Sequence, residues 1–591
     1  MIPAGQYDTG NRRDMSTSRQ NSRERGKDMT RLFETHQIRK QTMLTGRLWD
    51  FTALEGEHAG KHIPVMTPGC WETLPGYENY RGLAEYTTTF EAEGDIRLEF
   101  KGVSHMAWIF VDGKEVASHY NAYTPFDAVV RGLAAGVHEL KVKVDNSFKP
   151  EYALNRPNDY MSYGGISRAV VLEEISQVYV KNIHVTPLEP ADGGWKARIQ
   201  VFTENLTAAD VTVALQIELA GWNECSPERK AVPGTQMILD TVVTIPGVKS
   251  WMPDTPNLYL VKTALLIEGK KVDDLIDRIG FRTVSIQGNR VLMNGKSLRI
   301  KGFNRHEDHP QYGCALPLSA MAYDLALIRD MGGNSVRTSH YPNDELFLDL
   351  CDELGILVWE EHHLRGGSET MMRNPYFEIY AEQVIEEMIT LHYNHPSIYI
   401  WGIMNECASD TEFGRTCYEK QYALIRRLDQ SRVCSSASCR YEKDICMDLP
   451  DVVSWNMYPY WYERKTAEDM VNGLYNWTQN EGKGGGKPFL VTEIGAGALY
   501  GFRSHDRDPW TEEYQAECLE KQLTEVMNYQ NCMGLYIWQF CDVRVNREWF
   551  DRRPRTRNNK GIVDEFRRHK LAYDVVKRLF GAVPDYWEEE N

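Results

Sequence analysis

Two glutamates, each placed directly after a run of strand-forming residues, are the strongest candidates for chemistry in this sequence. Glu406 follows the apolar run 398–404, and an amide residue, Asn405, stands beside it. Glu493 follows a second run of the same kind, residues 489–492. Two carboxylates delivered to two strand ends suit acid/base and nucleophilic catalysis. The rest of the chain must therefore bring two strand ends to one place.

The length and composition limit the kind of protein that can carry such a pair. A chain of 591 residues is too long for one hydrophobic core, so we expect several domains. A formal net charge of -17 argues against a general affinity for nucleic acid or for anionic membranes. No apolar run reaches the roughly 18 residues of a membrane span. We predict a cytoplasmic protein with no nucleic-acid partner and no membrane partner.

The amino-terminal segment, residues 1–28, differs in composition from the rest of the chain. It is polar, rich in Ser and Arg, and has no continuous apolar stretch of the kind that a signal peptide needs. We predict a disordered arm, which is either an over-extended start or an arm that reaches a neighbouring subunit. The twelve cysteines show no metal-binding spacing, and we expect reduced thiols.

The spacing of apolar residues predicts three folded domains. Residues 29–175 alternate in short strands with turns, which is typical of a jelly-roll-like β-sandwich, and residues 176–285 suit a smaller immunoglobulin-like β-sandwich. From 286 to 591, short apolar strands alternate with amphipathic helices, which favours a (β/α)8 TIM barrel. The predicted barrel strands are 298–301, 335–337, 357–359, 398–401, 433–436, 453–455, 489–492 and 534–538, and the clearest helices are 320–331, 376–392 and 511–529.

Polar clusters follow six of these strands, where a barrel places its active site. The clusters are residues 304–308, residues 337–342, Asn405 with Glu406, Asn456 with Tyr458, Glu493, and Trp538 with Asp542. One such cluster could be an ordinary loop, but six at corresponding positions indicate a shared pocket.

In these motifs the chain resembles glycoside hydrolase family 2, in the branch that holds bacterial β-glucuronidases and β-galacturonidases. The resemblance runs from about residue 44 to 580 and includes the domain order, Gly-Val-Ser at 102–104 and Tyr-Gly-Gly-Ile-Ser-Arg at 163–168. It implies that Glu406 is the general acid/base and Glu493 the nucleophile. A retaining glycosidase needs two carboxyl groups about 5–5.5 Å apart, one protonated and one ionised. We expect Glu406 to be the proton donor and hydrogen-bond donors to keep Glu493 ionised.

The same resemblance suggests a substrate. Asn558 and Lys560 match the Asn-x-Lys element with which the glucuronidase branch grips a sugar carboxylate, although a solvated basic loop is the alternative reading of these residues alone. Asn405 can bind the 2-hydroxyl of the sugar, and Tyr458 can donate to the nucleophile. The resemblance further implies that the sugar subsite is lined by Asp159, His340, Tyr462 and Trp538.

One residue departs from the glucuronidase pattern. Arg365 stands where an aliphatic side chain is usual, and its guanidinium could bind the axial 4-hydroxyl of galacturonate, the 4-epimer of glucuronate. The alternative is that Arg365 pairs with Asp159 or Glu361 and only shapes the pocket. The segment between Arg365 and the helix near Tyr376 is short, so we expect an open aglycone side.

The sequence therefore predicts a retaining exo-β-hexuronidase that acts on terminal β-D-uronides, with a leaning to β-D-galacturonides because of Arg365. A β-glucuronidase is the alternative, and a catalytically inactive carbohydrate-binding protein is a remote one. We expect no cofactor and no metal, since 306–309 and 361–363 lack the spacing of a zinc helix motif. The expected partners are a small or oligosaccharide uronide and further copies of the chain in a homo-oligomer.

Overall fold

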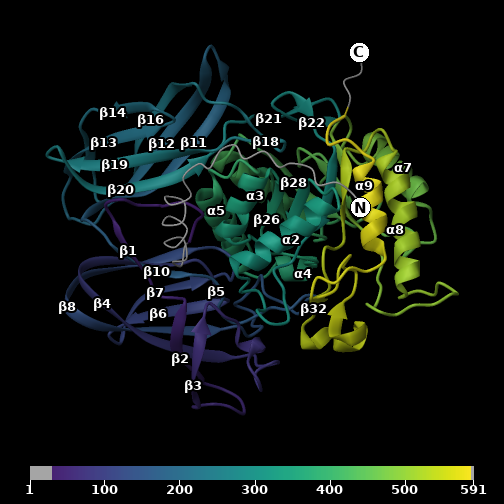
Figure 1. The fold of residues 1–591 in the computed structure, drawn as a ribbon, viewed down its shortest axis with the longest axis horizontal. Coiled ribbons are helices and arrows are strands. Elements are labelled where there is room, and N and C mark those ends of the chain that lie inside the picture. Colours follow the sequence, from purple (N-terminus) through teal and green to yellow (C-terminus); the bar gives the residue numbers. More distant parts are fainter. Residues whose placement is uncertain (1–29, 588–591) are drawn as a thin grey trace, which may run out of the picture.

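The computed structural model describes residues 30–587, which form two all-β regions followed by a closed barrel (Figure 1). The predicted fold class is confirmed, with β-sandwiches first and the barrel last. The predicted arm, residues 1–28, lies outside the described residues. The exact domain limits stay predictions.

The first β region is an antiparallel eight-stranded sheet built around two long strands, β4 and β8, which pair along most of their length. β2 pairs with the start of β4 and β10 with its end, so the sheet folds over one core. Every second side chain along β4 points inward because successive strand residues face opposite ways. The strands are β1 (Lys40–Met43), β2 (Arg47–Ala53), β3 (His62–Thr67), β4 (Leu83–Phe100), β6 (Met106–Val111), β7 (Lys114–Tyr120), β8 (Phe126–Asp145) and β10 (Val170–Glu174), with a separate pair β5 (Val103–Ser104) and β9 (Gly165–Ile166).

The second β region has two packed sheets around a core that includes Trp195 and Phe281. One sheet holds β11 (Val178–Ala191), β12 (Gly194–Asn205) and β16 (Gly234–Pro246). The other holds β13 (Val211–Leu219), β14 (Trp222–Cys225), β15 (Arg229–Ala231), β19 (Tyr259–Ile267) and β20 (Lys270–Ile279). Two small sheets connect this region to the barrel: one pairs β17 (Trp251–Met252) with β18 (Thr255–Pro256), and the other has three strands, β21 (Val284–Gln287), β22 (Arg290–Met293) and β23 (Lys296–Ser297).

The barrel is a closed ring of eight parallel strands in sequence order. The strands are β24 (Ile300–Asn304), β25 (Ser335–Thr338), β26 (Leu357–Glu361), β27 (Ile398–Ile403), β28 (Val433–Ser438), β29 (Val453–Asn456), β30 (Phe489–Ile494) and β31 (Gly534–Ile537). They are buried almost throughout, because helices cover the outer face and side chains fill the inside. The helices are α2 (Leu318–Asp330), α3 (Glu345–Leu354), α4 (Glu369–Met372), α5 (Phe377–His392), α6 (Glu412–Leu428), α7 (Ala467–Asn480), α8 (Glu512–Met527) and α9 (Ala572–Gly581).

The first barrel strand lies two residues later than the sequence predicted. Leu298 belongs to the floor of the barrel instead, where its backbone N–H donates to Val291 and it bridges to Tyr586. The apolar run that starts at Leu298 therefore serves two elements, which hydrophobicity alone could not separate. The predicted helices correspond to α2, α5 and α8.

Local signals fix the helix ends. The side chains of Asp344, Thr411 and Thr511 accept hydrogen bonds from the first turns of α3, α6 and α8. α3 ends at Gly355 with a left-handed φ of 70°, and a Cβ there would lie 2.0 Å from the carbonyl oxygen of Pro253. Only glycine fits this close approach.

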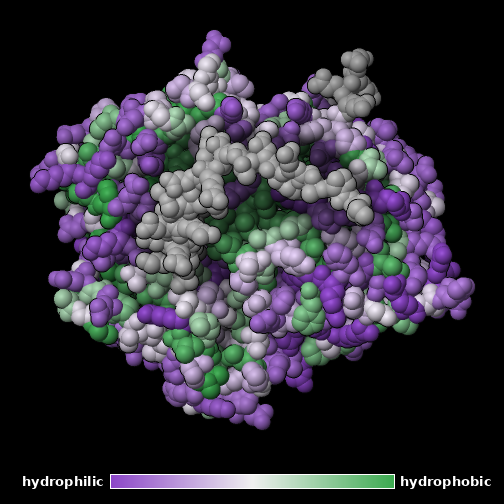
Figure 2. Space-filling view, in the orientation of Figure 1, coloured by the Kyte–Doolittle hydropathy of each residue, from purple (hydrophilic) through white to green (hydrophobic). Residues whose placement is uncertain are grey.

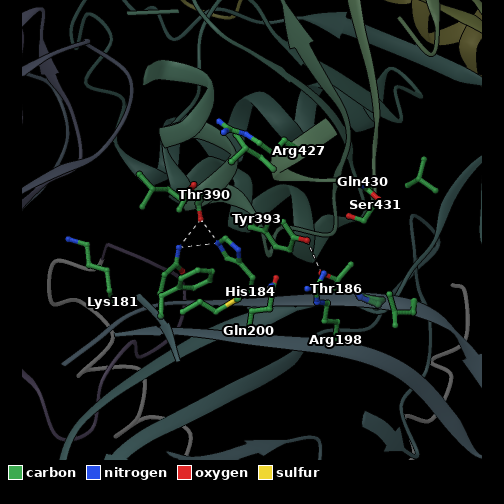
Figure 3. A pocket seen from close by; sticks show the side chains of 18 of the residues that line it. Lys181, His184, Thr186, Arg198, Gln200, Thr390, Tyr393, Arg427, Gln430 and Ser431 are labelled. Carbon is green, nitrogen blue, oxygen red and sulfur yellow. Dashed lines mark hydrogen bonds between the residues drawn. The ribbon is translucent and has the colours of Figure 1, made fainter. Parts of the chain in front are cut away.

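The second β region meets the barrel along a wide groove of about 1040 Å³ (Figure 3). The His184 ring stacks on Tyr393 with centroids 4.1 Å apart, and the hydroxyl groups of Thr186 and Tyr393 lie 2.7 Å apart. Asn182 Nδ2 and His184 Nε2 contact the Thr390 carbonyl oxygen at 2.9 and 3.0 Å. These contacts join the β11 edge to the end of α5.

The outer surface is mainly hydrophilic on the face seen in Figure 2, with hydrophobic residues in small patches. Among the described residues, no helix has the length and apolar character that crossing a membrane requires.

Candidate active site

The ends of the barrel strands surround a cavity of about 310 Å³ that also receives side chains from the first β region. Of the predicted site residues, eight line it: Asp159, Arg365, Glu406, Tyr458, Tyr462, Glu493, Trp538 and Lys560. The other three, Asn405, His340 and Asn558, do not line the cavity but contact the lining residues Asn456, Trp538 and Asp159, respectively. Five lining residues had no assigned role: Cys439, Tyr441, Asn456, Glu463 and Arg553.

Glu406 reaches the cavity from a strained turn at the end of β27. Its φ is 54° and that of Met404 is 25°, and a left-handed conformation costs a non-glycine residue about 1–3 kcal/mol. Gly402 lets this strand pass close to β26, since a Cβ there would lie 2.3 Å from Trp359 Nε1. Asn456 Nδ2 then donates to Glu406 Oε1 at 3.0 Å. The backbone thus fixes where the Glu406 carboxylate points.

Arg337 on β25 connects the buried carboxylates of the site. Its guanidinium makes two 2.9 Å bonds to Glu361, and Nη1 lies 3.2 Å from Glu493 Oε1. Nη2 donates to Asn405 Oδ1 at 2.9 Å. The sequence placed Arg337 in a polar cluster at a strand end but gave it no role, because its partners lie on three other strands.

Asn405 and His340 stand behind the cavity with one free polar atom each. Among residues 30–587, neither Asn405 Nδ2 nor His340 Nε2 has a hydrogen-bond partner, although both atoms are buried; His340 Nε2 lies 3.9 Å from Glu493 Oε1. His340 Nδ1 lies 2.8 Å from Glu361, and its ring stacks on Trp538 with centroids 5.1 Å apart. Buried polar atoms without partners are rare in folded proteins, so these two are available to a ligand.

Glu493 on β30 accepts from Tyr458 Oη at 2.6 Å and from Arg337. Burial, and next the negative charge of Glu406, raise the pKa of Glu493 to about 7, against the opposing effects of Arg337 and Tyr458. We expected the donors to keep Glu493 fully ionised. The donors oppose the rise in the pKa but do not cancel it, because Glu493 is only 3% exposed and has a second carboxylate nearby.

Lys560 and Asn558, the predicted carboxylate clamp, lie in two different layers of the site. Lys560 lines the cavity, where its Nζ donates to Tyr462 Oη at 2.7 Å. Burial lowers the pKa of Lys560, and Lys560 in turn is the main reason why the pKa of Tyr462 falls to about 8 despite burial. Asn558 lies behind Lys560 and donates its Nδ2 to Asp159 at 3.1 Å, while its buried Oδ1 has no partner within residues 30–587.

Asp159 comes from the first β region and is held by two arginines of the barrel. Arg365 Nη1 lies 2.8 Å from one carboxylate oxygen and Arg553 Nη2 lies 2.5 Å from the other. Burial opposes ionisation, but Arg365 and Arg553 hold the pKa of Asp159 well below its usual range. The pairing with Asp159 is the alternative that the sequence left open for Arg365, and Arg365 also lies 3.9 Å from Glu406.

Arg553 lines the cavity but was not predicted from the sequence. The run Arg552–Arg553 precedes Asn558 by a few residues, and this was the available signal. A basic pair in a loop is usually solvated, so its sequence could not distinguish it from a surface feature.

Two of the predicted polar clusters support the site from outside. Asp308 accepts from Tyr163 Oη, and Asp542 binds Lys570 Nζ and the backbone N–H of Gly561. Asp542 thereby holds the loop that carries Lys560. Neither carboxylate lines the cavity.

Within the described part of the chain, one group of side chains has the spacing of metal ligands: Asp349, Asp352 and His395. It lies apart from the cavity lining and is already engaged, since Arg31 binds Asp349 at 2.9 Å and His395 binds Asp352 at 2.6 Å. A buried network of ion pairs explains this cluster.

A barrel with paired glutamates at its strand ends, preceded by two β-sandwiches, defines a multidomain glycoside hydrolase. Three family models match the chain: "Glycosyl hydrolases family 2, TIM barrel domain" at residues 284–583, "Glycosyl hydrolases family 2" at 178–282, and "Glycosyl hydrolase 2 galactose-binding domain-like" at 79–187. The chain belongs to glycosyl hydrolase family 2, as the sequence motifs predicted.

Individual relatives point to one branch of that family. The crystal structure of a β-galacturonidase from Eisenbergiella tayi bound to galacturonate is 54% identical, with a TM-score of 0.92 over 95% of this chain and 100% of that one. A β-glucuronidase from Streptococcus agalactiae is 26% identical over 87% of this chain and 89% of its own length. A relative from Formosa agariphila is longer, so that its match, 27% identical, covers 84% of this chain and 62% of that protein. The predicted β-glucuronidase and β-galacturonidase branch is confirmed.

Homo-oligomerisation, a cytoplasmic location and the roles of single site residues stay predictions. The short segment after Arg365 holds only the four-residue helix α4 before α5 begins.

Proposed function

We propose that this protein is a retaining exo-β-hexuronidase that hydrolyses terminal β-D-galacturonides. The observation that carries the proposal is the meeting of Glu406, Glu493 and Lys560 in one cavity of about 310 Å³. The two carboxylates supply the chemistry of glycoside hydrolysis, and the buried ammonium group matches a sugar that carries a carboxylate.

In the first step, Glu493 attacks the anomeric carbon while Glu406 gives its proton to the glycosidic oxygen, so the aglycone leaves as an alcohol. The product is a glycosyl ester on Glu493. In the second step, Glu406 takes a proton from water, the resulting hydroxide attacks the anomeric carbon, and Glu493 leaves as a carboxylate. Both residues end in their starting protonation states.

The surrounding residues hold the sugar during these steps. Asn405 has a free Nδ2 that can donate to the 2-hydroxyl, and Tyr458 donates to the nucleophile. Lys560 binds the sugar carboxylate. Tyr462 accepts a hydrogen bond from Lys560, and Asn558 supports the site by donating to Asp159. Binding the carboxylate offsets the free-energy cost of burying the ammonium group of Lys560, which a neutral hexose could not do.

Arg365 is the residue that we assign to the choice of epimer. It lines the cavity between Asp159 and Glu406, at 2.8 and 3.9 Å, so its guanidinium faces the sugar from the side of the first β region. The similarity to the Eisenbergiella tayi β-galacturonidase supports the galacturonide, whereas the similarity to β-glucuronidases supports the glucuronide.

The test is kcat/KM on 4-nitrophenyl β-D-galacturonide and 4-nitrophenyl β-D-glucuronide. We expect the galacturonide to be preferred and Arg365→Val to reduce the preference by about tenfold, the size of one lost charge-assisted hydrogen bond. Equal or faster turnover of the glucuronide by the unmodified protein would show that the assignment is wrong. Retention of the anomeric configuration is read by NMR of the first product formed.

A further inference from the structure

The residues that line the cavity include two groups, which we call its two walls. One wall carries the cations Lys560, Arg553 and Arg365, all grouped around Asp159. The other carries Cys439, Tyr441 and Glu463, which lie in the segments that follow β28 and β29. The first wall serves the sugar carboxylate in the proposed function, and the second has no role so far.

Contacts place the second wall beside Glu406. The Glu406 backbone N–H donates to the Ala437 carbonyl oxygen at 2.9 Å, so the end of β28 runs next to it. Tyr441 Oη donates to the Asn456 carbonyl oxygen at 2.8 Å, and the Asn456 side chain donates to Glu406. Because Glu406 must protonate the glycosidic oxygen, the group that leaves passes along this wall.

Glu463 lines the cavity together with Cys439 and Tyr441. Its neighbour Tyr462 binds Lys560, whereas burial, followed by the Glu463 carboxylate, raises the pKa of Tyr441. Among residues 30–587, the Glu463 carboxylate makes no ion pair. Arg440, which lies between Cys439 and Tyr441 in the chain, pairs with Asp410 at 3.6 Å and donates to the Glu406 carbonyl oxygen at 3.4 Å. Asp159 and Glu493, by contrast, each have an arginine.

We propose that Glu463, with Tyr441 and Cys439, forms the aglycone subsite and makes the enzyme select uronides whose aglycone is neutral or cationic against those whose aglycone is acidic. The inference rests on the proposed function, since it needs a uronide in the cavity. An unpaired carboxylate beside the leaving group repels a second carboxylate and attracts an ammonium group. The substrate class is therefore a uronic acid linked to a neutral or amino-bearing alcohol, and a chain of consecutive uronic acids is disfavoured.

The test compares three galacturonides with similar leaving groups: benzyl, 4-carboxybenzyl and 4-(aminomethyl)benzyl. Release of the free uronic acid is followed by chromatography. In Glu463→Gln we expect kcat/KM for the carboxybenzyl compound, relative to benzyl, to rise about tenfold, and the aminomethyl ratio to fall by several-fold. Both shifts shrink when the salt concentration rises from about 0.02 to 0.5 M, because salt screens partly exposed charges.

Glu468→Gln is the matched control, since it removes an exposed carboxylate a few residues further along, outside the cavity lining. It should leave all three ratios within about twofold. Unchanged ratios in Glu463→Gln, or equal shifts in both variants, overturn the aglycone assignment while leaving the hexuronidase intact. No turnover of any uronide by the unmodified protein overturns both proposals, and the two failures are thereby distinguished.

Discussion

The candidate active-site cavity differs from the groove between the second β region and the barrel in volume and in the pairing of its polar side chains. The groove is more than three times larger, about 1040 Å³ against about 310 Å³, and cations including Arg198 and Arg427 line it. These cations pair with carboxylates: Arg198 lies 2.5 Å from Asp240 and Arg427 lies 3.1 Å from Glu386. In the cavity Arg365 and Arg553 also pair, both with Asp159, but the cavity contains in addition a buried carboxylate with a raised pKa, Glu493, and a buried ammonium group on Lys560.

The two regions also differ in how completely their buried polar side chains are paired. No lining residue of the groove has a buried side-chain nitrogen or oxygen without a hydrogen-bond partner. Around the cavity, Asn405, His340 and Asn558 each have one. The groove, whose buried polar side chains are paired, joins the second β region to the barrel. The unpaired polar atoms around the cavity are available to bind a ligand.

The largest contrast should come from Glu493→Gln, which keeps the shape of the side chain and removes the proposed nucleophile. We expect kcat/KM on 4-nitrophenyl β-D-galacturonide to fall by about ten-thousandfold or more. His184→Ala in the groove should change it by less than about threefold, since the groove contacts no reacting group. A thermal melt confirms that both variants are folded. Activity of Glu493→Gln within tenfold of the unmodified protein would contradict the role of Glu493.

Lys560→Met should give the next largest effect, because it removes the charge that we propose binds the sugar carboxylate but keeps the length of the side chain. We expect kcat/KM on the uronide to fall by about 100- to 1000-fold, a loss typical of a buried charge-assisted contact. Arg427→Met is the matched control in the groove and should have little effect. If 4-nitrophenyl β-D-galactoside, a neutral analogue, lost as much activity as the uronide, the clamp assignment would be wrong.

The pH dependence of kcat/KM compares one titratable group from each region, Glu493 in the cavity and His184 in the groove. Glu493 must be ionised to attack, and burial with Glu406 nearby raises its pKa to about 7, so kcat/KM should fall as the pH falls through about 7. Tyr458→Phe removes a donor to the carboxylate and should move this limb to higher pH. Burial lowers the pKa of His184 to about 4, so His184→Ala should leave the limb in place. A limb that stays fixed in Tyr458→Phe would contradict this account.

Tyr393→Ala in the groove should have the smallest effect on activity. It should nevertheless reduce the stability of the protein clearly. Tyr393 stacks on His184 and bonds Thr186, so its removal should lower the free energy of unfolding by about 3–5 kcal/mol. Tyr393→Phe keeps the ring and should lower it by only about 0.5–1.5 kcal/mol. Denaturant unfolding measures both, and kcat/KM at low temperature should stay within about twofold. A large loss of activity in the folded Tyr393→Phe protein would make the groove part of the functional site.

The sequence by itself determined the fold class and the two glutamates. Alternation in the β regions and the strand–helix rhythm after residue 286 are local patterns, and each barrel strand brings its following residues to the same end of the barrel. Glu406 and Glu493 could therefore be assigned to one site without knowing any contact. The apolar run at Leu298 was the exception, because one stretch served both the barrel floor and the first strand.

Only the tertiary structure decided how the charges of the site are shared. Asp159 and Arg553 are 394 residues apart in the chain yet bind each other, and Arg337 joins Glu361, Glu493 and Asn405 from different strands. The pKa of Glu493 depends on its burial and on a second carboxylate brought in by another strand. Hydrophobic periodicity is a property of neighbouring residues, whereas burial and charge pairing are properties of the packed molecule, and so the sequence named the two glutamates but not their electrostatic surroundings.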